Sequence, residues 1–293
     1  MRFVKVGMNC LRSITISIQS NFFTSPFLSA AGLRAILLAL FIICSPAAFG
    51  QNYAGLWHFN FEKERILVGV HYHKFVETDK ELKKKHFRLH DVEVMQSGGV
   101  LRYYAVWHSG RDSSMVRMHS WNKFLEVFNG SNMVLIDIET YLEGQERKFL
   151  GVWRQRNLSQ RLVAPCDQQR FLREWERLEK EGYRLIDIET FVDRGVRKYV
   201  GVFHAGTQES RLWLDDVDWK SFITIRKGLQ EQGFRLIDFE VYYNAKKQKR
   251  FIGVWMSGSY ETEMWVDLNW SKFKGKWDTI GVDNMRLVDL EVY

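Results

Sequence analysis

Carboxylate pairs spaced as Asp-x-Glu recur along the chain, each within an apolar run that is typical of a strand. The stretch GYRLIDIETF contains Asp187 and Glu189. Since side chains alternate between the two faces of a strand, we expect both carboxylates on the same side as Leu185. The opposite face is also apolar, so we expect an interior strand. The ten carboxylates are Asp91, Glu93, Asp137, Glu139, Asp187, Glu189, Asp238, Glu240, Asp289 and Glu291.

Buried carboxylates are costly unless they are paired, hydrogen-bonded or protonated. The favoured interpretation is structural: each pair fastens its strand to a neighbour, through Trp indoles or nearby basic residues. These basic residues are Arg65, Arg102, Lys148, Arg161, Lys198, Arg211 and Arg250. The alternative is a ring of carboxylates around a central channel that binds a divalent cation or a cationic ligand. Calcium sites usually lie in loops dense in Asp, Asn and Gly, so we predict no metal site.

Ser120 and Lys123 match the Ser-x-x-Lys spacing, in which a lysine one helical turn away can take the proton of a nucleophilic serine. They are the candidates for catalysis. Ser120 aligns, however, with Asp167, Asp218 and Asn269, each of which stands four residues before a Phe. An oxygen-bearing side chain at such a place caps the free N–H groups of a helix, which explains Ser120 without chemistry.

A third set of residues stands three positions after a recurring small residue. Its members are His58, His108, Arg154, His204 and Met256. A position that keeps its place in a repeat while its residue type changes can form an asymmetric binding face, so we predict these residues as the binding rim. Solvated loop residues are the alternative. Metal ligation is not favoured, because separate units would hold the imidazoles apart.

A repeated unit must position all of these residues. The five Asp residues of the Asp-x-Glu pairs are spaced by 46, 50, 51 and 51 residues. Each Asp-x-Glu pair lies in a strand that we call A. It is followed by strand B, which has a small residue at its centre, then by an apolar strand C and a short helix. The B strands are predicted at 53–57, 103–107, 149–153, 199–203 and 251–255, and the C strands at 65–68, 115–118, 161–164, 211–214 and 263–266. A glycine inside a B strand indicates that a Trp ring or a neighbouring sheet presses on the backbone.

The two ends of the repeat region indicate how the units assemble. The first repeat strand is of type B, without an A strand before it, and the last, ending at Tyr293, is of type A. Pairing these two completes the fifth unit and removes two free strand edges. We therefore predict a mainly β fold with short helices: a five-unit closed ring that resembles a β-propeller, closed by the C-terminal strand pairing with the first strand. An open solenoid is the alternative.

The first fifty residues differ in composition from the rest. They contain four of the 42 basic residues, none of the 35 acidic residues, and the apolar run AILLALFIIC. We predict a signal peptide over 1–50, cleaved before Gln51, and a single five-repeat domain over 51–293. An uncleaved anchor is the alternative. The remaining chain carries a net charge of about +3, too balanced to indicate nucleic acid binding. Cys166 is then the single cysteine, so no intrachain disulfide is possible.

The combination G-[YF]-R-L-x-D-x-E-x-[YF], a hairpin and [YF]-x-G-V-[WF] resembles a bacterial tandem repeat family. The same repeat is the structural repeat in the N-terminal part of polyglycine hydrolases. The resemblance implies that peptide cleavage in those enzymes belongs to a separate serine-hydrolase domain. This chain has no room for such a domain. The resemblance therefore implies a repeat scaffold and leaves its activity unassigned.

We predict an exported, secreted or periplasmic, non-catalytic scaffold without a cofactor. Its rim loops would bind a protein, peptide or glycan of the cell envelope or exterior, and no integral membrane span would remain after signal removal. The alternative is an extracytoplasmic hydrolase resembling a serine peptidase. A module that only stabilises a larger envelope assembly is the third possibility.

Overall fold

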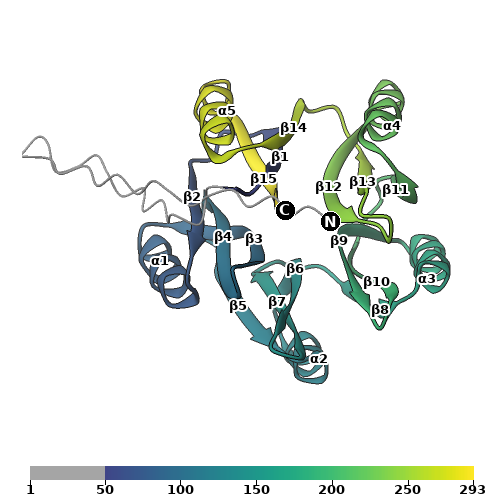
Figure 1. Ribbon diagram of the computed structural model, residues 1–293, viewed down its shortest axis with the longest axis horizontal. Coiled ribbons are helices and arrows are strands. Elements are labelled where there is room, and N and C mark those ends of the chain that lie inside the picture. The colour runs from purple at the N-terminus through teal and green to yellow at the C-terminus, as the bar shows by residue number, and fades with distance from the viewer. Residues whose placement is uncertain (1–49) are drawn as a thin grey trace, which may run out of the picture. The chain divides into compact units, whose positions relative to one another are not determined.

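The computed structural model describes residues 50–293, so residues 1–49 of the predicted signal peptide, with Cys10 and Cys44, lie outside the described residues. The described part is mainly β, with five helices and five three-stranded antiparallel sheets (Figure 1). No helix within it is long and apolar enough to cross a membrane. Cys166 is a buried free thiol at the end of a strand.

Each sheet has the same strand order, and the predicted A, B and C strands are all present. The A strands, at one edge, are β3 (Phe87–Ser97), β6 (Val134–Glu143), β9 (Tyr183–Asp193), β12 (Phe234–Tyr243) and β15 (Met285–Val292). The B strands, in the middle, are β4 (Val100–Ser109), β7 (Glu146–Arg154), β10 (Val196–Ala205), β13 (Lys249–Ser257) and β1 (Tyr53–Phe59). The C strands, at the other edge, are β2 (Glu64–Val70), β5 (Ser114–His119), β8 (Gln160–Cys166), β11 (Ser210–Val217) and β14 (Thr262–Leu268).

The structural unit differs from the predicted order A, B, C, helix. Four of the five C strands leave the sheet of the B strand before them and pair with the B strand that follows, as β2 does with β4. The last C strand, β14, pairs with β1. The unit is therefore C strand, helix, A strand and B strand. The helices are α1 (Tyr72–Lys84), α2 (Trp121–Gly130), α3 (Gln168–Lys180), α4 (Trp219–Glu231) and α5 (Trp270–Val282).

The first and last strands share one sheet, as predicted. Strand β1 lies between β14 and β15, with Tyr53 opposite Val292. Backbone hydrogen bonds join Asn52 and Tyr293 in both directions, at 2.8 and 3.0 Å. The A strands contact one another in the order β3, β6, β9, β12, β15, and β15 contacts β3 again.

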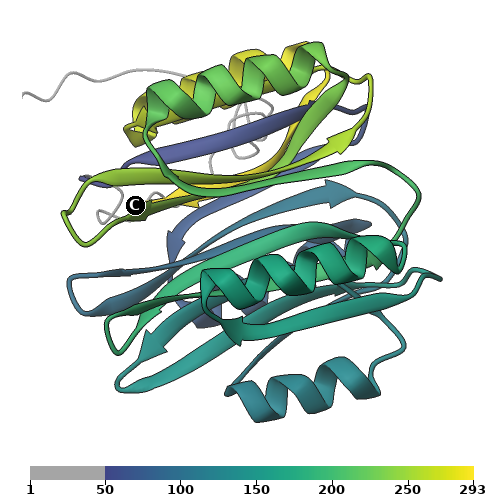
Figure 2. The ribbon, with the colours of Figure 1, turned by 90° about the vertical axis from the view of Figure 1, so that its right-hand side faces the viewer.

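The core of each unit is an aromatic pair between its helix and its B strand. Figures 1 and 2 show the helices on the outer side of the sheets. Ring centres are 6.1 Å apart for Phe75–Trp107, 5.3 Å for Phe124–Trp153, 6.4 Å for Phe171–Phe203, 5.6 Å for Phe222–Trp255 and 5.5 Å for Phe273–Trp57. The predicted close approach to the small B-strand residue is confirmed, because a Cβ atom on Gly253 would overlap the Trp255 ring.

Three of the four aligned cap residues bind the start of a helix as predicted. The side chains of Asp167, Asp218 and Asn269 accept hydrogen bonds from backbone N–H groups in the first turn of α3, α4 and α5. Ser120 stands at the N-cap of α2 but makes no such side-chain bond, so the cap predicted there was wrong. After α3, Gly182 adopts a left-handed conformation with φ of 84°, which lets the chain turn directly into the next A strand.

A β-bulge interrupts every A strand at the residue just before its Asp. In β9, Leu185 and Asp187 face consecutive residues of β10, so Ile186 is the extra residue. The equivalent residues are His90, Ile136, Ile237 and Val288. The extra residue changes the alternation of faces: Leu185 packs beside Phe171 on the helix side, whereas Ile186 and Asp187 both face a cavity. The predicted placement of Leu185 and Asp187 on one face was therefore wrong.

Candidate functional site

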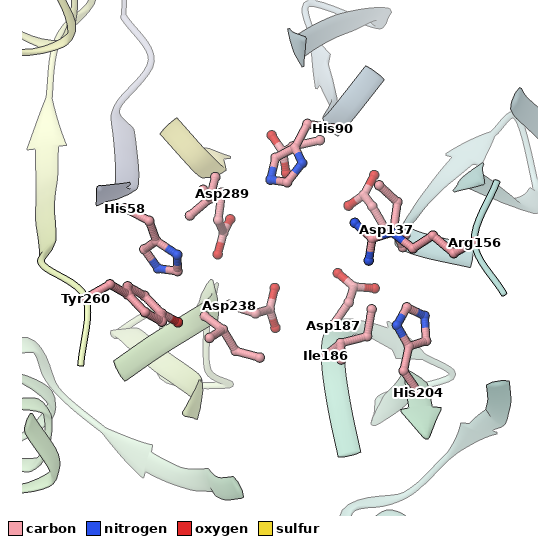
Figure 3. Close-up of a pocket in the computed structure, with 14 residues that line it drawn as sticks. His58, His90, Asp137, Arg156, Ile186, Asp187, His204, Asp238, Tyr260 and Asp289 are labelled. Carbon is pink, nitrogen blue, oxygen red and sulfur yellow. The ribbon is translucent and has the colours of Figure 1, made fainter. Parts of the chain in front are cut away.

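One cavity of about 470 Å³ is lined by residues from all five sheets (Figure 3). We call it the central cavity. Its acidic floor consists of Asp91, Asp137, Asp187, Asp238 and Asp289, all less than a tenth exposed. Its collar is formed by the bulge residues His90, Ile136, Ile186, Ile237 and Val288. Its mouth carries His58, His204, Arg156 and Tyr260, of which Arg156 is exposed.

The floor carboxyl groups connect neighbouring A strands through backbone amides. Asp187 Oδ2 accepts from the N–H of Ile138 at 3.1 Å, and Asp238 Oδ2 accepts from that of Ile188 at the same distance. Asp289 Oδ2 accepts from the N–H of Phe239 at 2.7 Å. Each donor directly follows the Asp of the neighbouring strand.

The other two floor residues keep this register with looser contacts. Asp91 lies next to the amide of Leu290, and Asp137 next to that of Val92. The Oδ2 atom of each is buried and makes no hydrogen bond. The acidic floor thus links strands, as the structural interpretation expected.

The partners predicted for the carboxylates were wrong. In the described part of the chain, no ion pair or side-chain hydrogen bond joins any of the ten carboxylates to Lys, Arg or an indole. The reason is visible at Arg65 and Arg250, which bind backbone carbonyls or exposed acids of their own sheets. A carboxyl group that faces its neighbour's backbone has no need of a long basic side chain.

The five Glu residues of the motif form a second buried layer that does not line the central cavity. Glu291 accepts a hydrogen bond from the N–H of Val241 at 3.3 Å, which repeats the register of the floor. Arg147 is the basic residue whose charge acts on Glu189. This layer extends the contacts between A strands below the floor.

Burial and crowding of like charges hold the carboxyl groups in their neutral form. Burial raises the pKa of Asp238 to about 8 and that of Glu189 to about 8. The pKa of Asp187 is raised well above its ordinary value, first by burial and then by the charges of Asp238 and Asp137. The acidic floor therefore carries much less negative charge at pH 7 than its composition suggests.

The predicted rim histidines lie at strand ends and are not solvated loop residues. His58 Nε2 lies 2.8 Å from the carbonyl oxygen of Leu236, and His204 Nε2 lies 2.6 Å from that of Leu135. His108 Nε2 lies 2.8 Å from the Leu287 carbonyl oxygen. Each ring therefore bridges to the A strand of a neighbouring sheet. Burial lowers the pKa of His58 and of His204 to about 4, which leaves both neutral at pH 7.

The remaining predicted rim residues have different surroundings. Arg154 is buried and pairs with Asp112, with its Nε atom 2.5 Å from the carboxylate. Met256 is half-buried at the end of β13. His108 stacks on His90 with ring centres 4.3 Å apart, and its pKa is lowered by burial but raised overall by Glu62 and Glu64. Of the five predicted rim residues, His58 and His204 line the central cavity.

Besides the four aliphatic bulge residues, three polar residues of the cavity were missed by the sequence interpretation: His90, Arg156 and Tyr260. His90 could have been found, because aliphatic residues occupy its place in the four other copies of the motif. Arg156 and Tyr260 lie in loops between B and C strands, where the repeats do not align. Tyr260 packs against His58 with ring centres 4.8 Å apart.

The catalytic candidates lie away from the central cavity. Lys123 Nζ is 2.6 Å from Glu126 on the exposed surface of α2, and Lys123 lines a separate shallow cavity with Met115. No hydrogen bond joins Lys123 to Ser120 among the described residues. The geometry therefore shows a helix surface with an ordinary ion pair at this place.

The polyglycine hydrolase-like structural repeat matches the chain at residues 68–110, 167–205 and 219–257. These three segments are similar to that structural repeat. Each matched segment contains a helix followed by the A–B hairpin, which is the unit order seen in the structure. The same order recurs in the unit of α2, whereas the unit of α5 takes its B strand from the start of the repeat region. No curated protein matches the chain.

Proposed function

We propose that this protein is an exported, non-catalytic repeat scaffold that binds a protein, peptide or glycan of the cell envelope or exterior in the mouth of the central cavity. The observation that carries the proposal is the composition of this cavity: the floor repeats in every unit, whereas the mouth does not. A repeated floor is explained by the fold. The unrepeated residues His58, Arg156, His204 and Tyr260 supply the asymmetry that a specific ligand needs.

The proposal includes a closed five-unit ring that resembles a β-propeller. It is supported by the pairing of β1 with β15 and by the contacts between A strands, which return to β3. In such a ring the A strands surround one axis, and a ligand at one end of that axis touches several units at once. Rim residues on different units then act together on one ligand.

Export is supported by the composition of the first fifty residues, which combine basic residues, an apolar run and small residues before Gln51. The protein would then act in the periplasm or outside the cell. Intact-mass analysis of the protein recovered from these compartments tests this step. A mass that begins at Gln51 is expected, and a mass that retains the first fifty residues would contradict cleavage.

Binding at the mouth is tested with the exported protein and a panel of soluble envelope peptides and glycans, followed by titration calorimetry. Tyr260→Ala and Arg156→Ala should each weaken binding by about tenfold or more, because a loss of about 1.4 kcal/mol is a factor of ten. Lys123→Ala, in the separate cavity on α2, is the matched control and should leave affinity unchanged. Ligands that bind all three variants as they bind the parent would place the binding surface elsewhere.

A further inference from the structure

The hairpins between A and B strands lie at the opposite end of the repeat domain from the mouth of the central cavity. Each A strand begins near the mouth, where its bulge residue lines the cavity, and four of the five end in a hairpin that leads to the B strand. Figure 2 shows these hairpins and the C-terminus at one end of the molecule. We call this end the hairpin face. It shares no residue with the central cavity, so it is free to contact a second partner.

Basic residues gather on two hairpins of this face. Residues 192–198, in the β9–β10 hairpin, include three basic residues and one acidic residue, and residues 243–250, in the β12–β13 hairpin, include four basic residues and no acidic residue. Together these two segments carry a net charge of +6, whereas residues 51–293 as a whole carry about +3. The matching segments of the other hairpins, 97–102 and 142–148, carry +1 and 0. The positive charge is therefore concentrated on one part of the hairpin face.

The two basic hairpins are neighbours, and part of their charge is not neutralised. Arg197 of the first hairpin donates a hydrogen bond at 2.9 Å to the carbonyl oxygen of Tyr243 in the second. Two of the seven cations form ion pairs with acidic residues of the C strands β11 and β14. Arg194, Lys246 and Lys247 are exposed and make no ion pair with any residue in the described range 50–293. These cations are available to an anionic partner.

Exposed apolar side chains stand among these cations. Val192 and Val196 of the β9–β10 hairpin are 51% and 48% exposed, and Tyr243 of the β12–β13 hairpin is 50% exposed. Apolar and aromatic side chains beside Lys and Arg suit the boundary between lipid head groups and acyl chains. A soluble polyanion such as a nucleic acid would use the cations but would gain nothing from exposed valines. The combination therefore favours a lipid bilayer.

The predicted signal peptide joins the domain at the same end. Asn52 and Tyr293 form the backbone pair that Arg250 and Tyr242 form in the β12–β13 hairpin, so Asn52 lies at the hairpin face. The apolar run at residues 35–44 ends six residues before Gly50. Since six residues span at most about 20 Å, a leader inserted in the bilayer during export would hold the hairpin face close to lipid.

We propose that the hairpin face docks the exported protein on an anionic phospholipid bilayer, with the cations of the two basic hairpins at the head groups and Val192, Val196 and Tyr243 at the boundary with the acyl chains. The inference goes beyond the proposed function, because it concerns a second surface and does not depend on what the mouth binds. Docking by this face points the mouth of the central cavity away from the bilayer, toward ligands in the surrounding space.

The experiment measures co-sedimentation of the exported protein with vesicles made of equal parts of phosphatidylglycerol and phosphatidylcholine, and with vesicles of phosphatidylcholine alone. We expect binding to the anionic vesicles and binding about tenfold weaker or less to the neutral ones. A lysine near an anionic surface strengthens binding by about fivefold, so the double change Lys246→Gln and Lys247→Gln should weaken vesicle binding by about 25-fold. The matched control is Lys84→Gln with Lys85→Gln at the exposed C-terminal end of α1, which removes the same charge and should leave binding unchanged.

A second pair of changes separates a bilayer from a soluble polyanion. Val192→Ser with Val196→Ser keeps every charge and should weaken vesicle binding by about tenfold, because less apolar surface leaves water. Binding of long-chain polyphosphate, the soluble polyanion used for comparison, should be the same in this variant and the parent. All these positions are exposed, and thermal melting checks the fold of each variant. If one variant does not fold, the other gives an independent answer.

Four results would overturn the inference. The first is no binding of the parent to the anionic vesicles, and the second is binding of polyphosphate without binding of vesicles. The third is an equal loss in the α1 control, since any surface charge would then serve. The fourth is full vesicle binding by the valine variant. None of these results bears on the proposed function, which is tested separately at Tyr260 and Arg156.

Discussion

Raising the pH from 5 to 8 should destabilise this protein, because its buried carboxyl groups must ionise. The pKa of Asp238 is raised by burial to about 8 in the folded chain, from an ordinary value near 4. A group with a raised folded-state pKa contributes stability that is complete below its unfolded-state pKa. That contribution is lost as the pH rises through the folded-state pKa.

The size of the loss follows from the shift. Each carboxyl group that titrates in the unfolded state but not in the folded state costs about 1.4 kcal/mol per pH unit. Between pH 5 and pH 8, Asp238 alone should therefore reduce the free energy of unfolding by about 3 kcal/mol. Glu189, with a pKa of about 8, adds a loss of the same order. Domains are stable by about 5–15 kcal/mol, so the change is large enough to measure.

Urea unfolding at pH 5, 6, 7 and 8 is the assay, with the parent compared with Asp238→Asn. The amide is neutral at every pH and keeps an oxygen for the N–H of Ile188. Its free energy of unfolding should therefore fall by about 3 kcal/mol less than that of the parent. Glu176→Gln, on the exposed face of α3, should follow the parent. Parent stability that stays level or rises from pH 5 to pH 8 would refute the argument that the floor is neutral, and so would equal slopes in parent and Asp238→Asn.

Three further changes test how the units are held together. Deleting residues 283–293 removes β15, and we expect the melting temperature to fall by more than about 10 °C, whereas a fall of a degree or two would contradict closure by this strand. Gly253→Ala should lower the free energy of unfolding by about 1–3 kcal/mol, because its new Cβ atom meets the Trp255 ring. Gly228→Ala inside α4 has free space for the new Cβ atom and should raise the free energy of unfolding by about 0.5–1 kcal/mol. His204→Ala removes the ring that binds the Leu135 carbonyl group and should lower the free energy of unfolding by about 1–3 kcal/mol, measured by chemical denaturation. His73→Ala, at an exposed position, should leave that free energy unchanged.

Features that depend on local sequence were predicted well. The helix caps at Asp167 and Asp218 follow from side-chain oxygens at fixed spacing, and the close approach at Gly253 follows from a glycine in a strand. The sharing of a sheet by the first and last strands followed from counting strand types. Each of these features is set by residues within a few positions of one another, or by the number of repeats.

Apart from the pairing of β1 with β15, features that depend on contacts between distant segments were not predicted. The sequence around β2 is the same whether it joins the preceding or the following B strand, so its partner could not be read from the pattern. The bulge at Ile186 is likewise absent from the hydrophobic pattern, because Leu185 and Ile188 are apolar in either register. The partners of the histidines were missed because the ring of His204 binds a carbonyl group 69 positions away.

The bulge connects the fold of this protein to its candidate site. In a regular strand Leu185 and Asp187 would share a face, and each unit would have to bury either a carboxyl group in its aromatic core or a leucine in the cavity. One extra residue removes the conflict: Leu185 packs beside Phe171, while Ile186 and Asp187 both turn to the cavity. Five repetitions place a collar, aliphatic except at His90, next to an acidic floor without any residue chosen for binding. Specificity then needs few changes, and His90, Arg156 and Tyr260 are the places where the chain departs from its own repeat.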